Sequence, residues 1–381
     1  MGRVSERENP FQPGAGARPP VLAGRDAELA LAEGLLGSLE RGRRPSEGLL
    51  LFGPRGNGKT SLLAQIAEDA RGRGMRADEL PASALRNPDD LRQHLQEAAG
   101  LVRTRLSGAQ LGGFGLSADR APPVRNVTHL VARWIRAHDT PLVILLDEIH
   151  AVAPDAGRMF FEAVQEATKS SLPFVLLAAG TPDAPRRIRR AGTFTERMFE
   201  HVPLGRLERH DTIRALRLPA SDSGLPLAGD AGTLLADESQ DYPYFIQLLG
   251  SAAWRAADEA GARDITVQSA RRGIASARAR IERFYAERLR EARERGVEEV
   301  LIPLAGRIRE RGGQIRELDL RPLLKALVAR ANLPGGEVRL LQTLTDLGVL
   351  WSGARGAWEM GIPSFADYLL ALPGADGLLH D

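Results

Sequence analysis

The sequence has no cysteine, and only three of its 51 basic residues are lysines. Without cysteine there are no disulfides, thiolate zinc sites or cysteine catalysis, and a reducing compartment suits such a chain. The formal net charge of +2 excludes nucleic-acid binding through a polybasic tail, although local basic faces remain possible. Because lysine is so scarce, Lys59, Lys169 and Lys325 are each candidates for a specific role.

Long hydrophobic runs are also missing. The longest, LVILL at 142–146 and FVLLAA at 174–179, are far shorter than the ~18 residues of a membrane-spanning helix. The first ten residues, MGRVSERENP, lack the apolar core of a signal peptide. We therefore expect a cytoplasmic, globular protein with no membrane partner, and 381 residues leave room for two or three domains.

The chain divides into four segments. Residues 1–20 are rich in proline and glycine and predict an extended arm that buries little surface. Residues 21–205 contain continuous apolar runs, typical of parallel strands covered by helices on both faces, and so predict an α/β domain. Residues 206–295 predict only helices, and residues 296–381 predict a separate small domain.

A glycine-rich loop follows the apolar run LLLF at 49–52 and leads into a predicted helix. The expected nucleotide-binding residues are Gly53, Pro54, Arg55, Gly56, Asn57, Gly58, Lys59, Thr60 and Ser61. The first eight fit the pattern G-x-x-x-x-G-K-[ST], in which glycines let the backbone wrap round phosphates at a helix N-terminus. Lys59 supplies a compact charge for the β- and γ-phosphates, which the broader guanidinium of arginine does not replace. Thr60 supplies a hydroxyl for Mg²⁺.

Two carboxylates, Asp147 and Glu148, end the apolar run at 142–146. A carboxylate at this edge of a sheet can hold Mg²⁺ through water, and its neighbour can activate the attacking water. Asp147 is thus the expected metal-side residue together with Thr60, and Glu148 the expected general base. An acidic helix start is the alternative, but the upstream phosphate loop favours the nucleotide site. We expect His150 to be an ordinary residue at a helix start.

These motifs resemble those of AAA+ ATPases. LAGRDAEL at 22–29 resembles the segment that precedes the phosphate loop and lines the adenine pocket. In FVLLAAGTPD (174–183), Thr181 matches the first sensor, a polar residue beside the γ-phosphate. In FTERMFEHVPLGRL (194–207), Arg197 matches the arginine finger. Such a finger reaches into the nucleotide of the neighbouring subunit, so the resemblance implies a homo-oligomer that binds ATP and Mg²⁺.

The segment DYPYFIQLLG at 241–250 resembles the lid of the initiator-like and STAND-like (signal-transduction ATPase) branches of this family. The resemblance implies a P-loop core with a parallel sheet, an all-α lid and a C-terminal winged helix. Two departures matter. The lid segment lacks the arginine that initiators carry as a second sensor, and several arginines beside Arg197 leave the finger open to another position within 186–197.

The last segment predicts a winged helix-turn-helix. Residues 318–331 and 334–350 predict two helices, and residues 351–360 predict a β-hairpin that turns at Gly353 and Gly356. On duplex DNA, the candidate contacts would be Arg339, Gln342, Thr343 and Thr345 of the second helix, Arg355 of the wing, and Arg321, Lys325 and Arg330 of the first helix.

Two acidic residues, Glu337 and Asp346, oppose phosphate at that second helix. The alternative is a winged helix that packs against the ATPase core or holds a partner protein. Trp351 and Trp358 are expected in the core rather than stacked on bases. Residues 107–124 predict a hairpin or a surface loop.

The sequence therefore predicts a Mg²⁺-dependent ATPase. It would hydrolyse ATP at the subunit interfaces of an oligomer and would remodel or load onto a DNA or protein partner. The alternative is a nucleotide-gated switch or scaffold with slow or no turnover, which acts through protein partners in signalling or defence. The presence of Glu148 favours the first, and the missing lid arginine favours the second.

Overall fold

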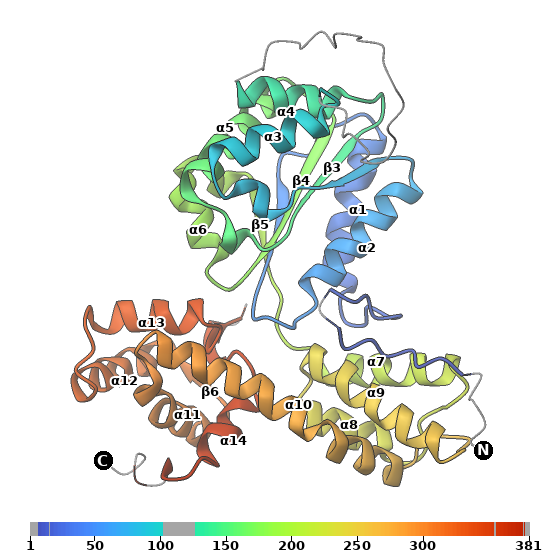
Figure 1. Cartoon of the computed structure of the whole chain (residues 1–381), viewed down its shortest axis with the longest axis vertical. Helices are drawn as coiled ribbons and strands as arrows, with labels where there is room; N and C mark the ends of the chain where they lie inside the picture. Colours follow the sequence, from blue (N-terminus) through green and yellow to red (C-terminus); the bar gives the residue numbers. More distant parts are fainter. Residues whose placement is uncertain (1–6, 15, 102–125, 354–355, 376, 378–381) are drawn as a thin grey trace, which may run out of the picture.

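The computed structural model describes residues 7–14, 16–101, 126–353, 356–375 and 377. The loop expected at 107–124 and the wing residue Arg355 lie outside these ranges. Figure 1 shows a sheet-containing domain above a lower layer, in which helices of the lid lie beside the C-terminal unit. Within the described ranges, no helix is both long and apolar enough to cross a membrane.

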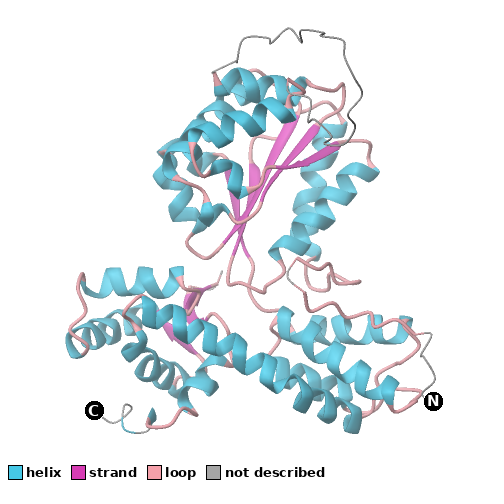
Figure 2. Ribbon diagram, in the orientation of Figure 1, coloured by secondary structure: helices cyan, strands magenta, loops and turns pink. Residues whose placement is uncertain are grey.

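The upper domain contains a five-stranded parallel sheet (Figure 2). Its strands are β1 (Gly48–Phe52), β2 (Arg76–Glu79), β3 (Leu142–Leu146), β4 (Phe174–Gly180) and β5 (Phe199–Pro203), in the order β2-β3-β4-β1-β5. The three continuous apolar runs of the sequence form the central strands β3, β4 and β1, which are buried along almost their whole length. The α/β prediction is confirmed.

Helices cover both faces of this sheet. One face carries α1 (Asp26–Glu40) and α2 (Lys59–Gly72); the other carries α3 (Pro88–Ala98), α4 (Val127–Arg136), α5 (Pro154–Lys169) and α6 (Ala184–Ala191). Short 3₁₀ helices are η1 (Ala82–Leu85), η2 (Ile149–Ala151), η3 (Thr193–Arg197) and η4 (Glu298–Val300). Alternate strand residues belong to different cores: Leu50 packs with the second group of helices, whereas Leu49 and Leu51 pack with the first.

The lid is all helical, as the sequence predicts. It comprises α7 (Arg209–Asp222), α8 (Ala231–Ser239), α9 (Pro243–Glu259) and α10 (Val267–Glu294). The C-terminal unit comprises α11 (Leu301–Glu310), β6 (Gln314–Arg316), α12 (Glu317–Arg330), α13 (Gly336–Asp346), β7 (Leu350–Ser352), β8 (Ala357–Met360) and α14 (Phe365–Leu370). Its strands form an antiparallel sheet in the order β6-β8-β7. Helices α11 to α13 with this sheet have the winged-helix arrangement.

The lid and the C-terminal unit share one continuous hydrophobic core. The 28-residue helix α10 runs along both parts, so the two segments that look separate in the sequence are joined by one element (Figure 1). The sequence offers no local pattern for this junction, because each half of α10 reads as an ordinary amphipathic helix.

The prediction that the N-terminal arm buries little surface is wrong for Phe11, which is only 4 % exposed. Its ring lies over Gly250 of α9, where an added Cβ would come within 2.7 Å of the ring. The Asn9 side-chain amide donates to the carbonyl oxygen of Ser251 at 3.1 Å. The arm contains no helix or strand in its described residues. Its aromatic ring is nevertheless buried, because Gly250 of α9 has no side chain and leaves room for the ring.

Candidate nucleotide site

The phosphate loop joins β1 to α2 and depends on left-handed glycines. Gly56 and Gly58 have φ of 84° and 82°, which favours residues without a Cβ. A Cβ at Gly56 would lie 2.7 Å from the Tyr242 hydroxyl, whereas a Cβ at Gly58 would meet no heavy atom within 4 Å. The loop is therefore packed closely against Tyr242 at Gly56 and open at Gly58, beside the N-terminus of α2, where an anion is favoured.

Two polar side chains of the predicted set serve the loop itself. The Asn57 side-chain amide donates to the carbonyl oxygen of Leu204 at 2.9 Å. The Ser61 hydroxyl donates to the carbonyl oxygen of Ala17 in the N-terminal arm at 3.1 Å. Both side chains therefore fix the loop and the start of α2 against neighbouring segments.

Lys59 is buried at the start of α2, where its ammonium donates to the carbonyl oxygens of Gly53 at 3.0 Å and Pro54 at 2.8 Å. Burial lowers the pKa of Lys59 to about 8, and the nearby carboxylates of Glu148 and Asp147 only partly oppose this effect. An ammonium has three donors, so one remains for a phosphate oxygen in addition to the two loop carbonyls.

Thr60 and Asp147 meet at the carboxyl edge of the sheet. The Thr60 hydroxyl donates to Asp147 Oδ2 at 2.6 Å, and the Glu148 N–H donates to Asp147 Oδ1 at 2.7 Å. A hydroxyl and a carboxylate side by side are hard oxygen donors of the kind that hydrated Mg²⁺ prefers. The predicted Mg²⁺ residues therefore lie together and fit the ion.

Glu148 is held by a partner that the sequence did not predict. It has a left-handed backbone, with φ of 53°, and its Oε2 lies 2.9 Å from His150 Nε2. The hydrogen bond from His150 lowers the pKa of Glu148 below its ordinary value. We expected His150 to be only a helix-start residue; the turn at Glu148 instead brings its ring back onto the carboxylate. In the sequence, the one sign of this contact is that Glu148 and His150 are two residues apart, on either side of the turn.

Thr181 is buried at the end of β4, the strand beside β1. Its hydroxyl donates to the Asp183 carboxylate, which also accepts from the Arg187 guanidinium. Arg187 in turn donates to the carbonyl oxygen of His150 at 2.9 Å. A continuous set of contacts thus links the expected sensor residue to the partner of Glu148.

The lid contacts the phosphate loop directly. The Tyr242 hydroxyl donates to the carbonyl oxygen of Arg55, and the Tyr244 N–H donates to that of Gly56 at 3.1 Å. On the other side, buried Arg25 donates to the carbonyl oxygens of Asn57 and Gly205 at 3.1 and 2.8 Å. The loop is therefore gripped between the first helix of the chain and the start of α9.

A buried arginine on α10 lies beside the phosphate loop, although the segment 241–250 contains none. Arg288 lines a narrow cavity together with Pro54, Arg55 and Thr181. Its guanidinium donates to Glu291 at 2.6 Å, and Glu291 also pairs with Arg55 at 3.1 Å. Burial lowers the pKa of Arg288. Sequence reasoning missed it because it lies far along the chain from both the loop and the lid motif.

Comparison with known proteins agrees with this geometry. Residues 21–177 match the AAA ATPase domain family. This part of the chain therefore resembles an AAA ATPase domain. No curated protein matches the chain. Among solved structures, it is similar to a Walker-type ATPase of Pyrococcus abyssi, PABY2304, with 15 % identity, a TM-score of 0.60, and 92 % and 97 % of the two chains covered.

A second similar structure is the ORC2 protein of Aeropyrum pernix in its ADP form, with 17 % identity, a TM-score of 0.53, and 96 % of each chain covered. At these identities the likenesses establish the fold alone. They confirm the predicted fold, and both likenesses extend over more than nine-tenths of this chain, through the lid and the C-terminal unit.

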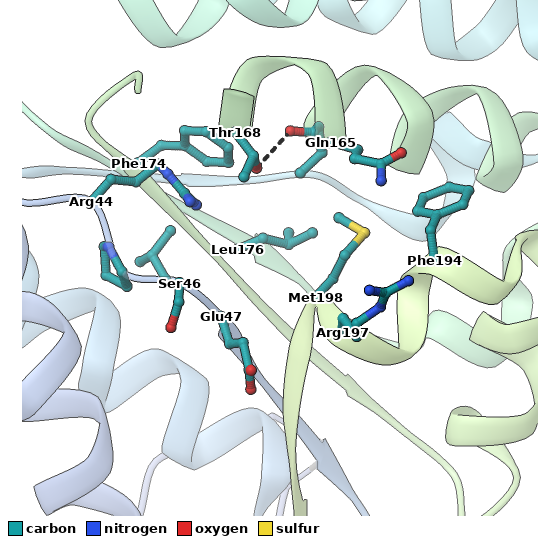
Figure 3. Close-up of a pocket in the computed structure, with 14 residues that line it drawn as sticks. Arg44, Ser46, Glu47, Gln165, Thr168, Phe174, Leu176, Phe194, Arg197 and Met198 are labelled. Carbon is teal, nitrogen blue, oxygen red and sulfur yellow. Dashed lines mark hydrogen bonds between the residues drawn. The ribbon is translucent and has the colours of Figure 1, made fainter. Parts of the chain in front are cut away.

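Arg197 lies at the opposite edge of the sheet from the phosphate loop. It is exposed just before β5 and lines a pocket of about 260 Å³ beside Gly48 and Phe174, the first residues of β1 and β4 (Figure 3). The structure therefore does not bring Arg197 to the phosphate loop of its own chain. The finger role assigned to it requires a neighbouring subunit.

The arginines of 186–197 differ in their surroundings. Arg186, Arg187 and Arg189 pair with carboxylates, those of Asp346, Asp183 and Glu196 respectively. In the described chain, no carboxylate oxygen lies within 4.0 Å of the guanidinium of Arg190 or Arg197. These two are the members of the cluster with a guanidinium available to a neighbour.

The C-terminal unit packs against the α/β domain. The Trp351 ring, 3 % exposed, meets the Phe52 ring edge-on with centroids 5.8 Å apart. Asp346 at the end of α13 accepts from Arg186 of α6, and Glu359 pairs with Arg206 at 2.6 Å. Trp351 is therefore a core residue, as expected, and α13 is anchored by its C-terminal end.

The candidate DNA contacts of the winged helix have mixed surroundings. Arg339 and Gln342 are exposed on α13, whereas the hydroxyls of Thr343 and Thr345 donate to carbonyls one turn back at 3.0 and 2.8 Å. Arg321 is paired with Glu317. DNA binding through this helix stays a prediction.

Proposed function

We propose that this protein is a Mg²⁺-dependent ATPase that works as an oligomer and changes its hold on a DNA or protein partner. The observation that carries the proposal is the 2.6 Å hydrogen bond between Thr60 and Asp147, beside the buried Lys59. It supports the proposal because an ammonium suited to phosphate and two oxygen donors suited to Mg²⁺ lie together at one edge of the sheet.

Each residue then has a defined task. The loop N–H groups and Lys59 bind the β- and γ-phosphates, and Thr60 with Asp147 hold Mg²⁺. The ion, when bound, neutralises charge that develops on the phosphates. Glu148 accepts the proton of the attacking water once its carboxylate faces the γ-phosphate.

Two further groups complete the proposed site. Thr181 orients the γ-phosphate from the end of β4, and Arg288 of α10 offers a positive charge from the lid side, where it shares a cavity with Thr181. Arg197 serves the nucleotide of the adjacent subunit, and its exposed position at the far edge of the sheet supports that assignment.

A nucleotide-gated switch with slow turnover is the second candidate, favoured by the contact between Glu148 and His150. That contact holds the proposed base on a neighbouring side chain and lowers its pKa, both of which weaken it as a base. The hydrogen bonds from Tyr242 and Tyr244 to the phosphate loop would couple the bound nucleotide to the lid without turnover.

The proposal is tested by nucleotide binding to two lysine variants of the full chain. Lys59→Ala should lower ATP affinity at least tenfold, because it removes a buried, charge-assisted contact to phosphate. Lys169→Ala is the matched control, since Lys169 is exposed and paired with Glu166. Wild-type affinity in Lys59→Ala would sink the phosphate-loop assignment. Turnover by the wild type separates the ATPase from the switch.

A further inference from the structure

Helix α10 has two arginine-rich parts in different electrostatic surroundings. From Arg288 onward the arginines are paired: Arg288 with Glu291, Arg290 with Glu287 and Glu294, and Arg293 with Glu298. Earlier in the helix five arginines are exposed and form no ion pair within the described chain: Arg271, Arg272, Arg278, Arg280 and Arg283. Arg280 instead donates to the Tyr244 hydroxyl at 3.2 Å and to the carbonyl oxygen of Pro13 at 2.5 Å. We call the other four residues the arginine face. Glu282 is the single acidic residue between 267 and 283.

The orientation of this face is fixed by packing on its other side. Gly273 of α10 approaches α9 so closely that an added Cβ would lie 2.4 Å from the backbone nitrogen of Ala253. Ala277, one turn later, is also buried. The helix cannot rotate without breaking this contact, so the arginine face stays on the outside.

The spacing of the face suits a row of phosphates. Arg271 and Arg278 lie seven residues apart on one side, with Arg272 and Arg283 on the adjoining row. Positions 271 to 283 span about 18 Å of helix, longer than the ~12 Å width of a major groove, so the ends reach phosphates of both strands. Ala275 and Ala279 between them are small and exposed, which allows close approach.

The arginine face lacks the exposed aromatic rings that binding of single-stranded nucleic acid would require. Single-stranded nucleic acid is bound largely by stacking on exposed aromatic rings. The aromatic residues of α10, Phe284 and Tyr285, pack into the shared core of the lid and the C-terminal unit. The arginine face also offers few groups that could read base edges.

We infer that the arginine face of α10 binds the phosphate backbone of duplex DNA without reading its sequence. The winged helix is the less favourable surface, because α13 carries one arginine, Arg339, and its C-terminal end is tied to α6 through Asp346. The inference does not rest on ATP hydrolysis, since none of the four arginines belongs to the nucleotide site.

The test is binding of the full chain to a labelled duplex of arbitrary sequence, followed by fluorescence anisotropy at 50 to 200 mM salt. The test variant replaces Arg271, Arg272, Arg278 and Arg283 by Gln. The matched control replaces four exposed, ion-paired arginines, Arg214, Arg290, Arg293 and Arg307, in the same way. Both variants lose the same charge. The slope of log affinity against log salt should fall in magnitude by about 3 to 4 in the test variant only.

Between these salt concentrations, the wild type should therefore weaken roughly a hundredfold more than the test variant. Two controls exclude a folding defect as the cause. The test variant should keep the wild-type rate of basal ATP hydrolysis, and the single variant Arg278→Glu should also weaken DNA binding. The inference is overturned if the test variant keeps the wild-type slope, or if the control loses as much. Loss of binding in Arg339→Gln alone, or equal affinity for a single strand or an RNA duplex, would also contradict it.

Discussion

The Trp351 ring of the C-terminal unit meets the Phe52 ring edge-on, with centroids 5.8 Å apart. Phe52 is the last residue of β1, and the next residue, Gly53, begins the phosphate loop. A movement of the loop on nucleotide binding can therefore reach the C-terminal unit through this aromatic contact, which is worth about 0.5–1.5 kcal/mol beyond its buried area.

The contact predicts an optical signal. ATP binding should change the intrinsic tryptophan fluorescence of the wild type, and Trp351→Phe should abolish most of the change. Trp134→Phe should preserve it, because Trp134 is buried on α4 with its indole N–H donated to Asp78 at 2.9 Å. An undiminished signal in Trp351→Phe would show that the loop does not communicate through this ring.

The pKa of Lys59 predicts how ATP affinity depends on pH. Phosphates stabilise the charged ammonium, and its pKa without nucleotide is about 8. Below pH 8 Lys59 is already charged; above it, binding must take up a proton, so affinity should fall by up to about tenfold per pH unit. The phosphates, with a pKa near 6, are already ionised in this range.

Calorimetry in EDTA at pH 9, in two buffers of different ionisation enthalpy, measures this proton uptake directly. Lys59→Ala should remove it. A flat affinity from pH 7.5 to 9.5 would contradict the depressed pKa.

His150→Ala should speed turnover. The substitution removes the hydrogen bond that lowers the pKa of Glu148, so the carboxylate becomes a stronger and freer base. One charge-assisted hydrogen bond of about 1.5 kcal/mol corresponds to about a tenfold rise in kcat, with KM unchanged. His210→Ala is the control, since His210 is exposed and pairs with Asp211 instead. A lower kcat would instead make His150 a residue that supports catalysis.

Arg197 predicts complementation between two inactive variants. Arg197→Ala and Lys59→Ala should each hydrolyse little ATP alone. Equal amounts mixed together should restore roughly a quarter of the wild-type rate, since random assembly pairs an intact Lys59 with an intact Arg197 at that frequency. Arg190→Ala mixed in the same way tests the other available arginine of the cluster. Restoration by neither mixture would show that neither Arg197 nor Arg190 is the finger.

The sequence predicts the central part of the site because each residue comes shortly after an apolar run. Asp147 directly follows the run at 142–146, Thr181 lies two residues after the run at 174–179, and Thr60 follows the loop after 49–52. Carboxyl ends of parallel strands meet at one edge, so local patterns suffice to bring these residues together.

The remaining contacts depend on how separate units dock, and no local pattern encodes that. Arg288 lies beside the phosphate loop only because α10 is docked next to that loop. Likewise, Trp351 contacts Phe52 only because the C-terminal unit packs against the end of β1. The burial of Phe11 is equally hard to predict. A proline-rich arm has no periodic hydrophobic pattern, and the Phe11 ring packs on Gly250, which is 239 residues away in the sequence.

The most direct measurement of the proposed ATPase compares hydrolysis and binding in wild type and Glu148→Gln, each with Mg²⁺ and with EDTA. Removal of a general base should slow hydrolysis about 10²- to 10⁴-fold, while ATP affinity stays within about threefold because Lys59 and Thr60 are untouched. EDTA should stop hydrolysis by the wild type. Mg²⁺-dependent hydrolysis at the wild-type rate in Glu148→Gln would contradict the assignment of the base, and no hydrolysis by the wild type would contradict the ATPase itself.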